Sequence, residues 1–194
     1  MENKKKGKVL SFFKKYGYYV VALALILGIT LSVALSANPS KTNPEDSTPT
    51  DSTPIVFALP LNSPEVLKWY SDSELMYNDT LKQWESHKGV DMKSSSDDLS
   101  VYSVLDGVVT NIEDTYEFGT VLTITHENGF VSVYSSLETN LNVNISDKVK
   151  KGQKVGNVSD TATNEQQTGN HLHFELYKDG QKVDPSNYLS LENK

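Results

Sequence analysis

The chain has 194 residues, of which 37% are hydrophobic and 22% are charged, with a net charge of -7 and no cysteine. This length suits one folded domain of ordinary size with appended segments. The acidic balance argues against nucleic-acid binding, which needs a concentrated basic surface, and the lack of cysteine excludes disulfides and thiolate metal sites.

The N-terminal part predicts a membrane anchor. Residues 1–15 form a basic tail in which six lysines stand against one glutamate, so this tail carries +5 and the remainder of the chain -12. Residues 16–37 contain no charged residue, and their middle reads VVALALILGITLSVAL. About 20 such residues in a helix span roughly 30 Å of hydrocarbon. We therefore expect one transmembrane helix over 16–37, with the lysine-rich N-terminus in the cytoplasm and the C-terminal domain outside it.

A cleaved secretory signal is the alternative, since Ala34-Leu35-Ser36 loosely fits the small-x-small cleavage pattern. Signal cores usually run about 7–15 apolar residues, and this segment is longer. The sequence favours the uncleaved anchor.

Residues 38–54 (NPSKTNPEDSTPTDSTP) are rich in Pro, Ser and Thr and almost lack apolar side chains. Such a segment cannot bury enough surface to fold and predicts an extended tether. Residues 55–85 form a pre-domain segment. Within it, Ser63-Pro64-Glu65 resembles an N-cap, an N1 proline and a first-turn acid, which predicts a short helix ending near Tyr70.

From about Val90 onward, short runs rich in Val, Ile, Thr and Tyr alternate with Gly, Asn and Asp, a pattern typical of antiparallel β-structure. Two dipeptides, Asn128-Gly129 and Asp179-Gly180, are favoured where a hairpin turn needs positive φ. We expect a mainly β domain with two tight hairpins at these positions.

Three of the four histidines fall in two short motifs, His87-Lys-Gly-Val-Asp91 and His171-Leu-His173. Alternate side chains of a strand share a face, so His171 and His173 would lie together, on the same face as Glu175. The residues between them are apolar and are expected to face the core: Leu172, Phe174 and Leu176.

The first motif can bring an imidazole and a carboxylate to one ion, because Gly89 gives the chain between His87 and Asp91 the freedom to bend. Two nitrogens and one oxygen with an open fourth position make the ligand set of a catalytic zinc ion. Either motif alone fits a surface ion pair or a polar strand face. Both motifs in one β domain point to a metal site.

These residues carry a resemblance to the lysostaphin-type zinc metallopeptidase domain, over about Ser86 to Leu189. The matching segments occur in the family's order: HKGVD, LDGVV, GTVLTITHENGFVSVYSSL, KVKKGQKVG and TGNHLHFEL. The resemblance implies an antiparallel, barrel-like β domain of the duplicated hybrid motif type, at residues 86–190. It also implies cleavage of peptide cross-links in peptidoglycan.

The resemblance implies that Zn2+ is bound by His87, Asp91 and His173. His171 then takes the place of the histidine that positions or deprotonates water. Ser136 stands where the family has its second catalytic histidine, and a hydroxyl cannot carry a proton at neutral pH as imidazole does. We expect a loss of about 10²–10⁴-fold in catalysis.

His126 matches a family histidine without a metal role, which predicts a structural residue.

The basic tail, single anchor, polar tether, small pre-domain segment and incomplete peptidase site together resemble the stage II sporulation protein Q family. That resemblance implies a forespore-membrane protein whose domain lies in the intermembrane space and binds stage III sporulation protein AH from the mother cell. Three functions stay open: a docking protein, an active endopeptidase on peptidoglycan, and an activator of a separate wall hydrolase.

Overall fold

The structure is a computed structural model that describes residues 55–192, which lie within one compact unit, residues 53–194. The basic tail, the anchor at 16–37 and the tether at 38–54 predicted above fall outside the described residues. Within 55–192, no helix has the length and apolar composition that a membrane crossing needs.

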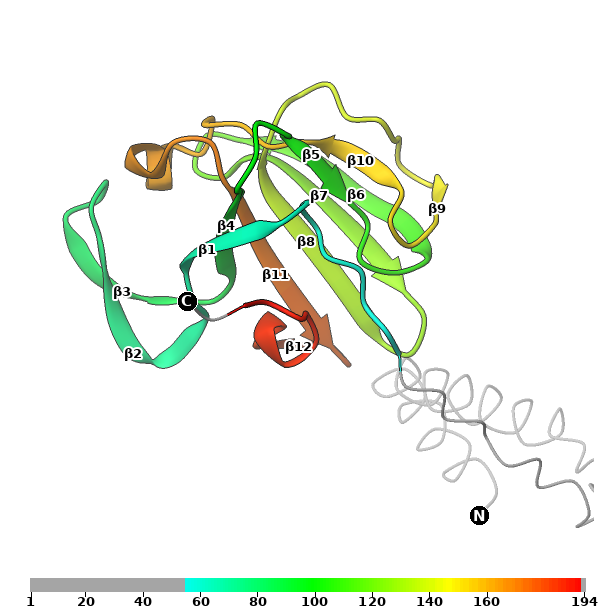
Figure 1. Cartoon of the computed structure of the whole chain (residues 1–194), viewed down its shortest axis with the longest axis horizontal. Coiled ribbons are helices and arrows are strands. Elements are labelled where there is room, and N and C mark those ends of the chain that lie inside the picture. Colours follow the sequence, from blue (N-terminus) through cyan, green and yellow to red (C-terminus); the bar gives the residue numbers. More distant parts are fainter. Residues whose placement is uncertain (1–54, 193–194) are drawn as a thin grey trace, which may run out of the picture. The chain divides into compact units, whose positions relative to one another are not determined.

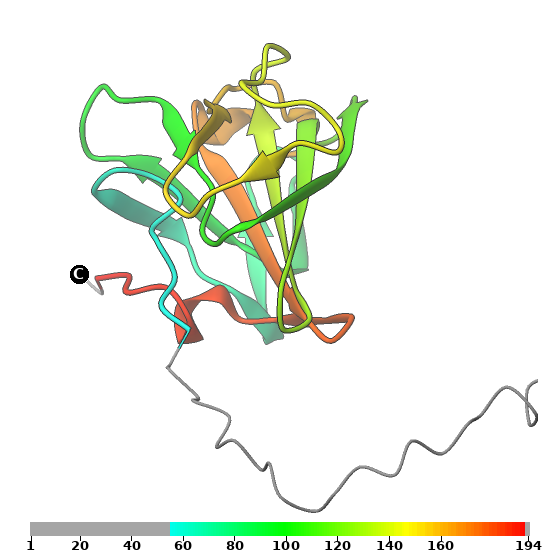
Figure 2. The ribbon, with the colours of Figure 1, turned by 90° about the vertical axis from the view of Figure 1, so that its right-hand side faces the viewer.

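One large antiparallel sheet forms the body of the domain, confirming the expectation of a mainly antiparallel β fold (Figure 1). Its strands, in spatial order, are β1 (Pro64–Lys68), β4 (Val90–Ser94), β11 (Leu172–Lys178), β8 (Phe130–Leu137), β7 (Gly119–His126), β6 (Gly107–Thr115) and β9 (Lys148–Val149). A short strand, β12 (Gln181–Val183), also pairs with β11. Strands β7, β8 and β11 run side by side along the domain (Figure 2).

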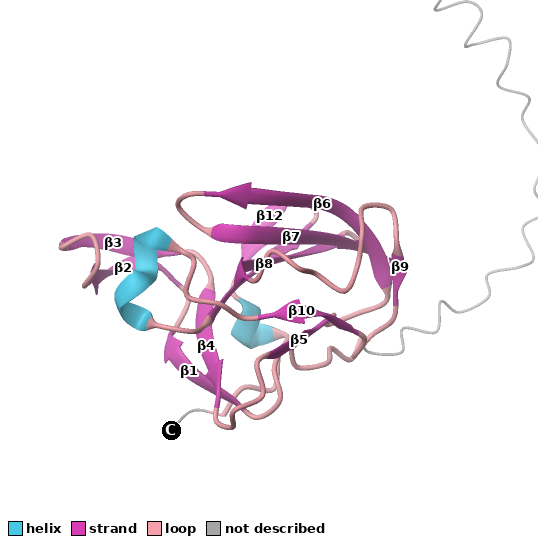
Figure 3. Cartoon of the chain, turned by 90° about the horizontal axis from the view of Figure 1, so that it is seen from above, coloured by secondary structure: helices cyan, strands magenta, loops and turns pink. Residues whose placement is uncertain are grey.

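Two small sheets and two 3-10 turns complete the described part. Their elements are β5 (Ser100–Tyr102) with β10 (Lys154–Asn157), β2 (Ser71–Asn78) with β3 (Gln83–His87), η1 (Thr163–Thr168) and η2 (Pro185–Asn187). In the view from above, the β5–β10 pair lies opposite β6 and β7 (Figure 3). Buried side chains from both layers, among them Val101, Val155, Leu122 and Ile124, form one core cluster.

Both predicted hairpin turns occur. Asn128 and Gly129 have φ of 56° and 74° between β7 and β8, and Asp179 and Gly180 have φ of 52° and 79° between β11 and β12. The two turns also contact each other, because the Asp179 amide donates to the Gly129 carbonyl at 2.8 Å. A Cβ at residue 129 would collide with the Asp179 carboxylate. Glycine at 129 is therefore required for its φ and for the close approach of the second turn.

The predicted helix from Ser63 to about Tyr70 is wrong, because this segment forms β1. Ser63 has a φ of 47°, unlike the extended backbone of an N-cap, and Pro64 occupies the first position of a strand at the edge of the sheet. Proline is tolerated there because no ladder hydrogen bond is required of it. Pairing of β1 with β4, which sets Lys68 opposite Asp91, outweighs the local helix signal.

The predicted alternation of the HLHFEL strand is confirmed in β11. The side chains of Leu172, Phe174 and Leu176 are fully buried in the core. His173 pairs with Asp91 of β4 on one side and with Ser135 of β8 on the other. The register of the main sheet therefore brings the two histidine motifs together.

Candidate metal centre

Four buried side chains bring their donor atoms within 4.8 Å of one another: His87, Asp91, Glu165 and His173. The Asp91 Oδ1 atom lies 3.1 Å from His87 Nε2 and 2.7 Å from His173 Nδ1, and the two imidazole nitrogens are 3.3 Å apart. The three predicted ligands are thus gathered at one point.

Close packing around Gly89 makes this arrangement possible. A Cβ at residue 89 would lie 2.7 Å from the His173 ring and 2.8 Å from the Phe174 carbonyl oxygen. Gly89 lies at a bend between β3 and β4, as expected, and the close packing gives a second, steric reason for glycine there. Any side chain at this position would displace the His173 ring from the cluster.

Each of the two predicted histidine ligands is oriented through its second ring nitrogen. His87 Nδ1 donates to the Trp69 carbonyl at 2.9 Å, which leaves Nε2 facing the cluster. His173 Nε2 faces the Glu175 carboxylate at 3.4 Å, and Lys182 Nζ in turn lies 2.7 Å from Glu175. Partners of this kind fix the ring orientation and the tautomer of metal-binding histidines.

The charged states of these four side chains depend on one another. Burial alone would raise the pKa of Asp91, but hydrogen bonds from His173 and His87 hold it well below its usual range. Burial would lower the pKa of His173, and the hydrogen bonds with Asp91 and Glu175 instead raise it to about 10. The buried Asp91 carboxylate therefore requires a positive charge beside it, which either a metal ion or a protonated imidazole can supply.

The donor set fits zinc. Ligand atoms about 2.0–2.1 Å from a tetrahedral ion lie roughly 3.3–3.5 Å from one another, close to the 2.7–3.3 Å separations among His87, Asp91 and His173. Asp91 Oδ2 is also buried without a hydrogen bond, and the nearby cation is Lys68 Nζ at 3.4 Å.

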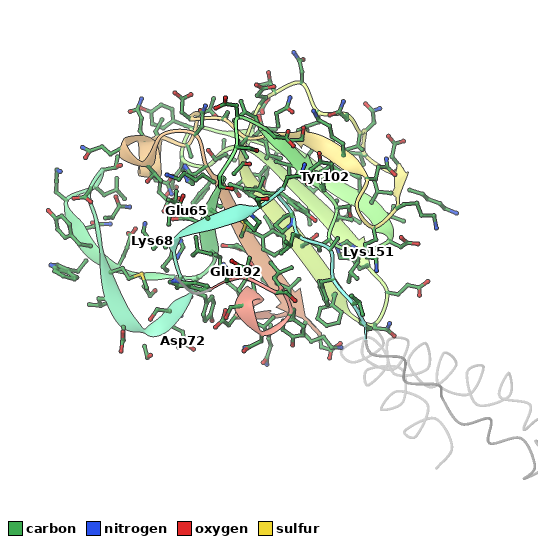
Figure 4. All side chains as sticks on the ribbon, in the orientation of Figure 1. Glu65, Lys68, Asp72, Tyr102, Lys151 and Glu192 are labelled. Carbon is green, nitrogen blue, oxygen red and sulfur yellow. The ribbon has the colours of Figure 1, made fainter. Side chains whose placement is uncertain are left out.

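Glu165 and Lys68 are functional candidates that the sequence did not indicate. Glu165 lies in η1, within the polar segment TNEQQT, and nothing in that segment distinguishes it from a solvent-exposed residue. In the structure it is only 5% exposed. Lys68 lies within the segment for which the sequence predicts a helix. Its Nζ lies 3.1 Å from Glu165 Oε1, in the position labelled at the end of β1 in Figure 4.

His171 and Ser136 lie beside the cluster in different roles. His171 Nδ1 donates to the Gly169 carbonyl at 2.8 Å, and its Nε2 lies 3.4 Å from Glu165 Oε2. Ser136 is fully buried with a φ of 62°, and its hydroxyl donates to the Ser159 carbonyl at 2.8 Å. The His171 amide donates to the same carbonyl at 3.4 Å, so one carbonyl oxygen accepts hydrogen bonds from both Ser136 and His171.

The remaining histidine, His126, is buried outside this cluster. Its Nδ1 donates to the Asp106 carbonyl at 3.0 Å and its Nε2 lies 2.7 Å from Ser132 Oγ. Burial lowers the pKa of His126 below the usual value. These contacts suit a neutral imidazole that joins β7, β8 and the turn before β6.

The sequence comparisons identify the family. The model of peptidase family M23 matches residues 85–185. The chain belongs to this family. The match contains the HxxxD and HxH motifs and Glu165, but Lys68 and the β2 strand precede it.

The chain is also similar to sporulation proteins. The chain is 34% identical over 114 residues to stage II sporulation protein Q of Bacillus subtilis, covering 58% of this chain and 38% of that protein. The chain therefore spans well under half the length of that relative. A solved structure described as the SpoIIQ-SpoIIIAH pore forming complex matches with a TM-score of 0.59 and 28% identity, over 69% of this chain and 90% of the matched one.

The catalytic domain of lysostaphin from Staphylococcus simulans matches with a TM-score of 0.52 and 22% identity. That alignment covers 66% of this chain and 92% of the lysostaphin domain. This likeness shows the shared fold, and the expected lysostaphin-type β domain is confirmed at that level.

The lowered pKa of His126 predicts an acid-sensitive component of stability. Unfolding frees this imidazole to bind a proton near pH 6.5, so its contribution is present above that pH and declines as the pH falls. His126→Gln should remove this component. Urea unfolding of both metal-free proteins at pH 7.5 and 5.5 should show wild type losing more stability than the variant. An equal loss in the two proteins would contradict the assignment.

Proposed function

We propose that the protein is a zinc-binding docking protein of sporulation with impaired peptidase activity. In this proposal it is held in the forespore membrane by residues 16–37, and its domain lies in the intermembrane space. There it binds a stage III sporulation protein AH of the mother-cell membrane.

The observation that carries the docking role is the match to SpoIIQ chains solved with SpoIIIAH. Two such complexes match at a TM-score of 0.58–0.59, over 90% and 99% of the matched chains. The alignment therefore includes nearly all of the domain that is present in those complexes. The B. subtilis relative supports the same role by sequence, over 38% of its length.

Zinc would be held by His87, Asp91 and His173. Bound zinc supplies Lewis-acid polarisation of a carbonyl in hydrolytic sites and cross-links the fold in structural ones. Here the three ligands join β3, β4 and β11 at one point. Zinc binding would therefore stabilise the folded domain.

Impaired catalysis is supported by Ser136. Proton transfer by a positioned imidazole contributes about 10²–10⁴-fold to such reactions, and a serine hydroxyl does not replace it at neutral pH. The Ser136 hydroxyl is in addition engaged with the Ser159 carbonyl at 2.8 Å. The Ser136 hydroxyl is therefore already used as a hydrogen-bond donor to the backbone.

An active zinc endopeptidase for peptidoglycan is the second candidate. The observation in its favour is the complete predicted ligand set, together with a buried His171 beside it. An endopeptidase would cut peptidoglycan, whereas a docking protein would bind its partner without cutting peptidoglycan.

Docking predicts direct binding of the full chain, purified in detergent, to the extracytoplasmic domain of the SpoIIIAH protein from the same genome. Biolayer interferometry should give saturable binding, while the lysostaphin catalytic domain, with the same fold, should give none. Absence of binding by the full chain, or equal binding by lysostaphin, would contradict the docking role.

Impaired catalysis predicts that the zinc-loaded full chain releases no more soluble muropeptides from purified peptidoglycan than its His173→Ala variant. The variant lacks one zinc ligand and serves as the blank. Chromatography of the soluble fraction is the measurement. Release by the wild type clearly above this blank would establish the endopeptidase instead.

A further inference from the structure

We propose that Glu165 is a fourth protein ligand that closes the zinc site, with the Lys68 ammonium group as its charge partner. This inference rests on the proposed zinc site and deepens it. A hydrolytic zinc site has three protein ligands and one open position, whereas a structural site has four protein ligands. Closure by Glu165 would make the centre structural even though the three predicted ligands are intact.

The first support is the position of the Glu165 carboxylate. Its Oε1 lies 4.0 Å from His87 Nε2, and its Oε2 lies 3.8 Å from His173 Nδ1. These separations exceed those among the other three ligands by less than 1.5 Å. A small movement of one flexible side chain would complete a four-ligand sphere.

The second support is the relation between Glu165 and His171. The resemblance to lysostaphin-type peptidases gives His171 the place of the histidine that positions or deprotonates water. In this chain the His171 Nε2 atom lies 3.4 Å from Glu165 Oε2. The Glu165 carboxylate therefore contacts His171 and also lies within 4.0 Å of the ligand nitrogens of His87 and His173.

Lys68 provides the third support. Its Nζ lies 3.1 Å from Glu165 Oε1 and 3.4 Å from Asp91 Oδ2, and its side chain is 22% exposed. The ammonium group spans two buried carboxylates that would otherwise repel each other. It reaches them from β1, whose pairing with β4 sets Lys68 opposite Asp91. This contact comes from outside the matched peptidase region, so the pre-domain segment takes part in closing the site.

The β2–β3 hairpin provides the fourth support, because it fastens η1 over the cluster. The Asn78 side-chain amide donates to the Asn164 carbonyl at 3.1 Å, and the Gln167 amide donates to Thr80 Oγ1 at 3.1 Å. Figures 1 and 3 show η1 beside the end of this hairpin. The backbone on both sides of Glu165 is thus tied to the hairpin, which keeps the Glu165 side chain within reach of the cluster.

The burial of His87, Asp91, Glu165 and His173 agrees with a closed centre. All four of these residues are at most 9% exposed. A peptide substrate would have to displace Glu165 and Lys68 to reach the metal.

The test loads the full chain with Co2+ in place of zinc and adds excess azide, a small anion that binds open metal positions. The wild-type visible spectrum should not respond to azide. Glu165→Gln, which removes the ligand charge, and Glu165→Asp, which keeps the charge but shortens the reach, should both respond. Glu113→Gln, exposed on β6, is the matched control and should behave as wild type.

Zinc affinity, measured by competition with a chelator, gives a second readout. Glu165→Gln should weaken binding at least about tenfold, the range seen for changes to groups that support metal ligands, and Glu113→Gln should not weaken it. A wild-type spectrum that responds to azide as strongly as Glu165→Gln, or unchanged affinity in that variant, would overturn closure but leave the zinc site standing. Failure of the wild type to bind either metal would overturn the zinc site and closure together.

Discussion

The Asp91 carboxylate is the constraint around which the rest of this domain is arranged. It is fully buried, and one of its oxygens contacts imidazoles from two different strands. A buried anion is costly unless it is paired, so the surrounding structure must supply positive charge and hydrogen bonds. The β1–β4–β11 register, the close packing at Gly89 and the Lys68 contact all meet this requirement.

The same requirement connects the fold to the proposed docking role. A peptidase must keep one side of its metal open to substrate, which leaves a polar, water-filled cleft beside the core. A protein that serves as a binding surface gains from a closed metal centre, because the ion then cross-links strands that the sheet alone would hold less firmly. Ser136, joined to the Ser159 carbonyl, and Glu165, facing His171, both fit such a stabilised scaffold.

The sequence predicts those parts of the site that follow strict local rules. Alternation along HLHFEL and the two positive-φ turns depend on the period and backbone of adjacent residues, so the β11 strand and both hairpins were predicted correctly. Glu165 and Lys68 could not be found this way, because their positions depend on pairing across 97 residues of chain. The helix predicted after Ser63 failed for a related reason: β4 offers an edge that only the folded sheet provides.

We propose that one metal ion binds among His87 Nε2, Asp91 Oδ1, His173 Nδ1 and the Glu165 carboxylate. Anomalous diffraction at the zinc edge, from crystals of the zinc-loaded protein, tests it most directly. A closed zinc centre predicts a single strong anomalous peak within bonding distance of all four side chains. A peak that contacts only the first three, with Glu165 still paired to Lys68, would contradict closure, and the absence of any peak there would contradict the metal centre itself.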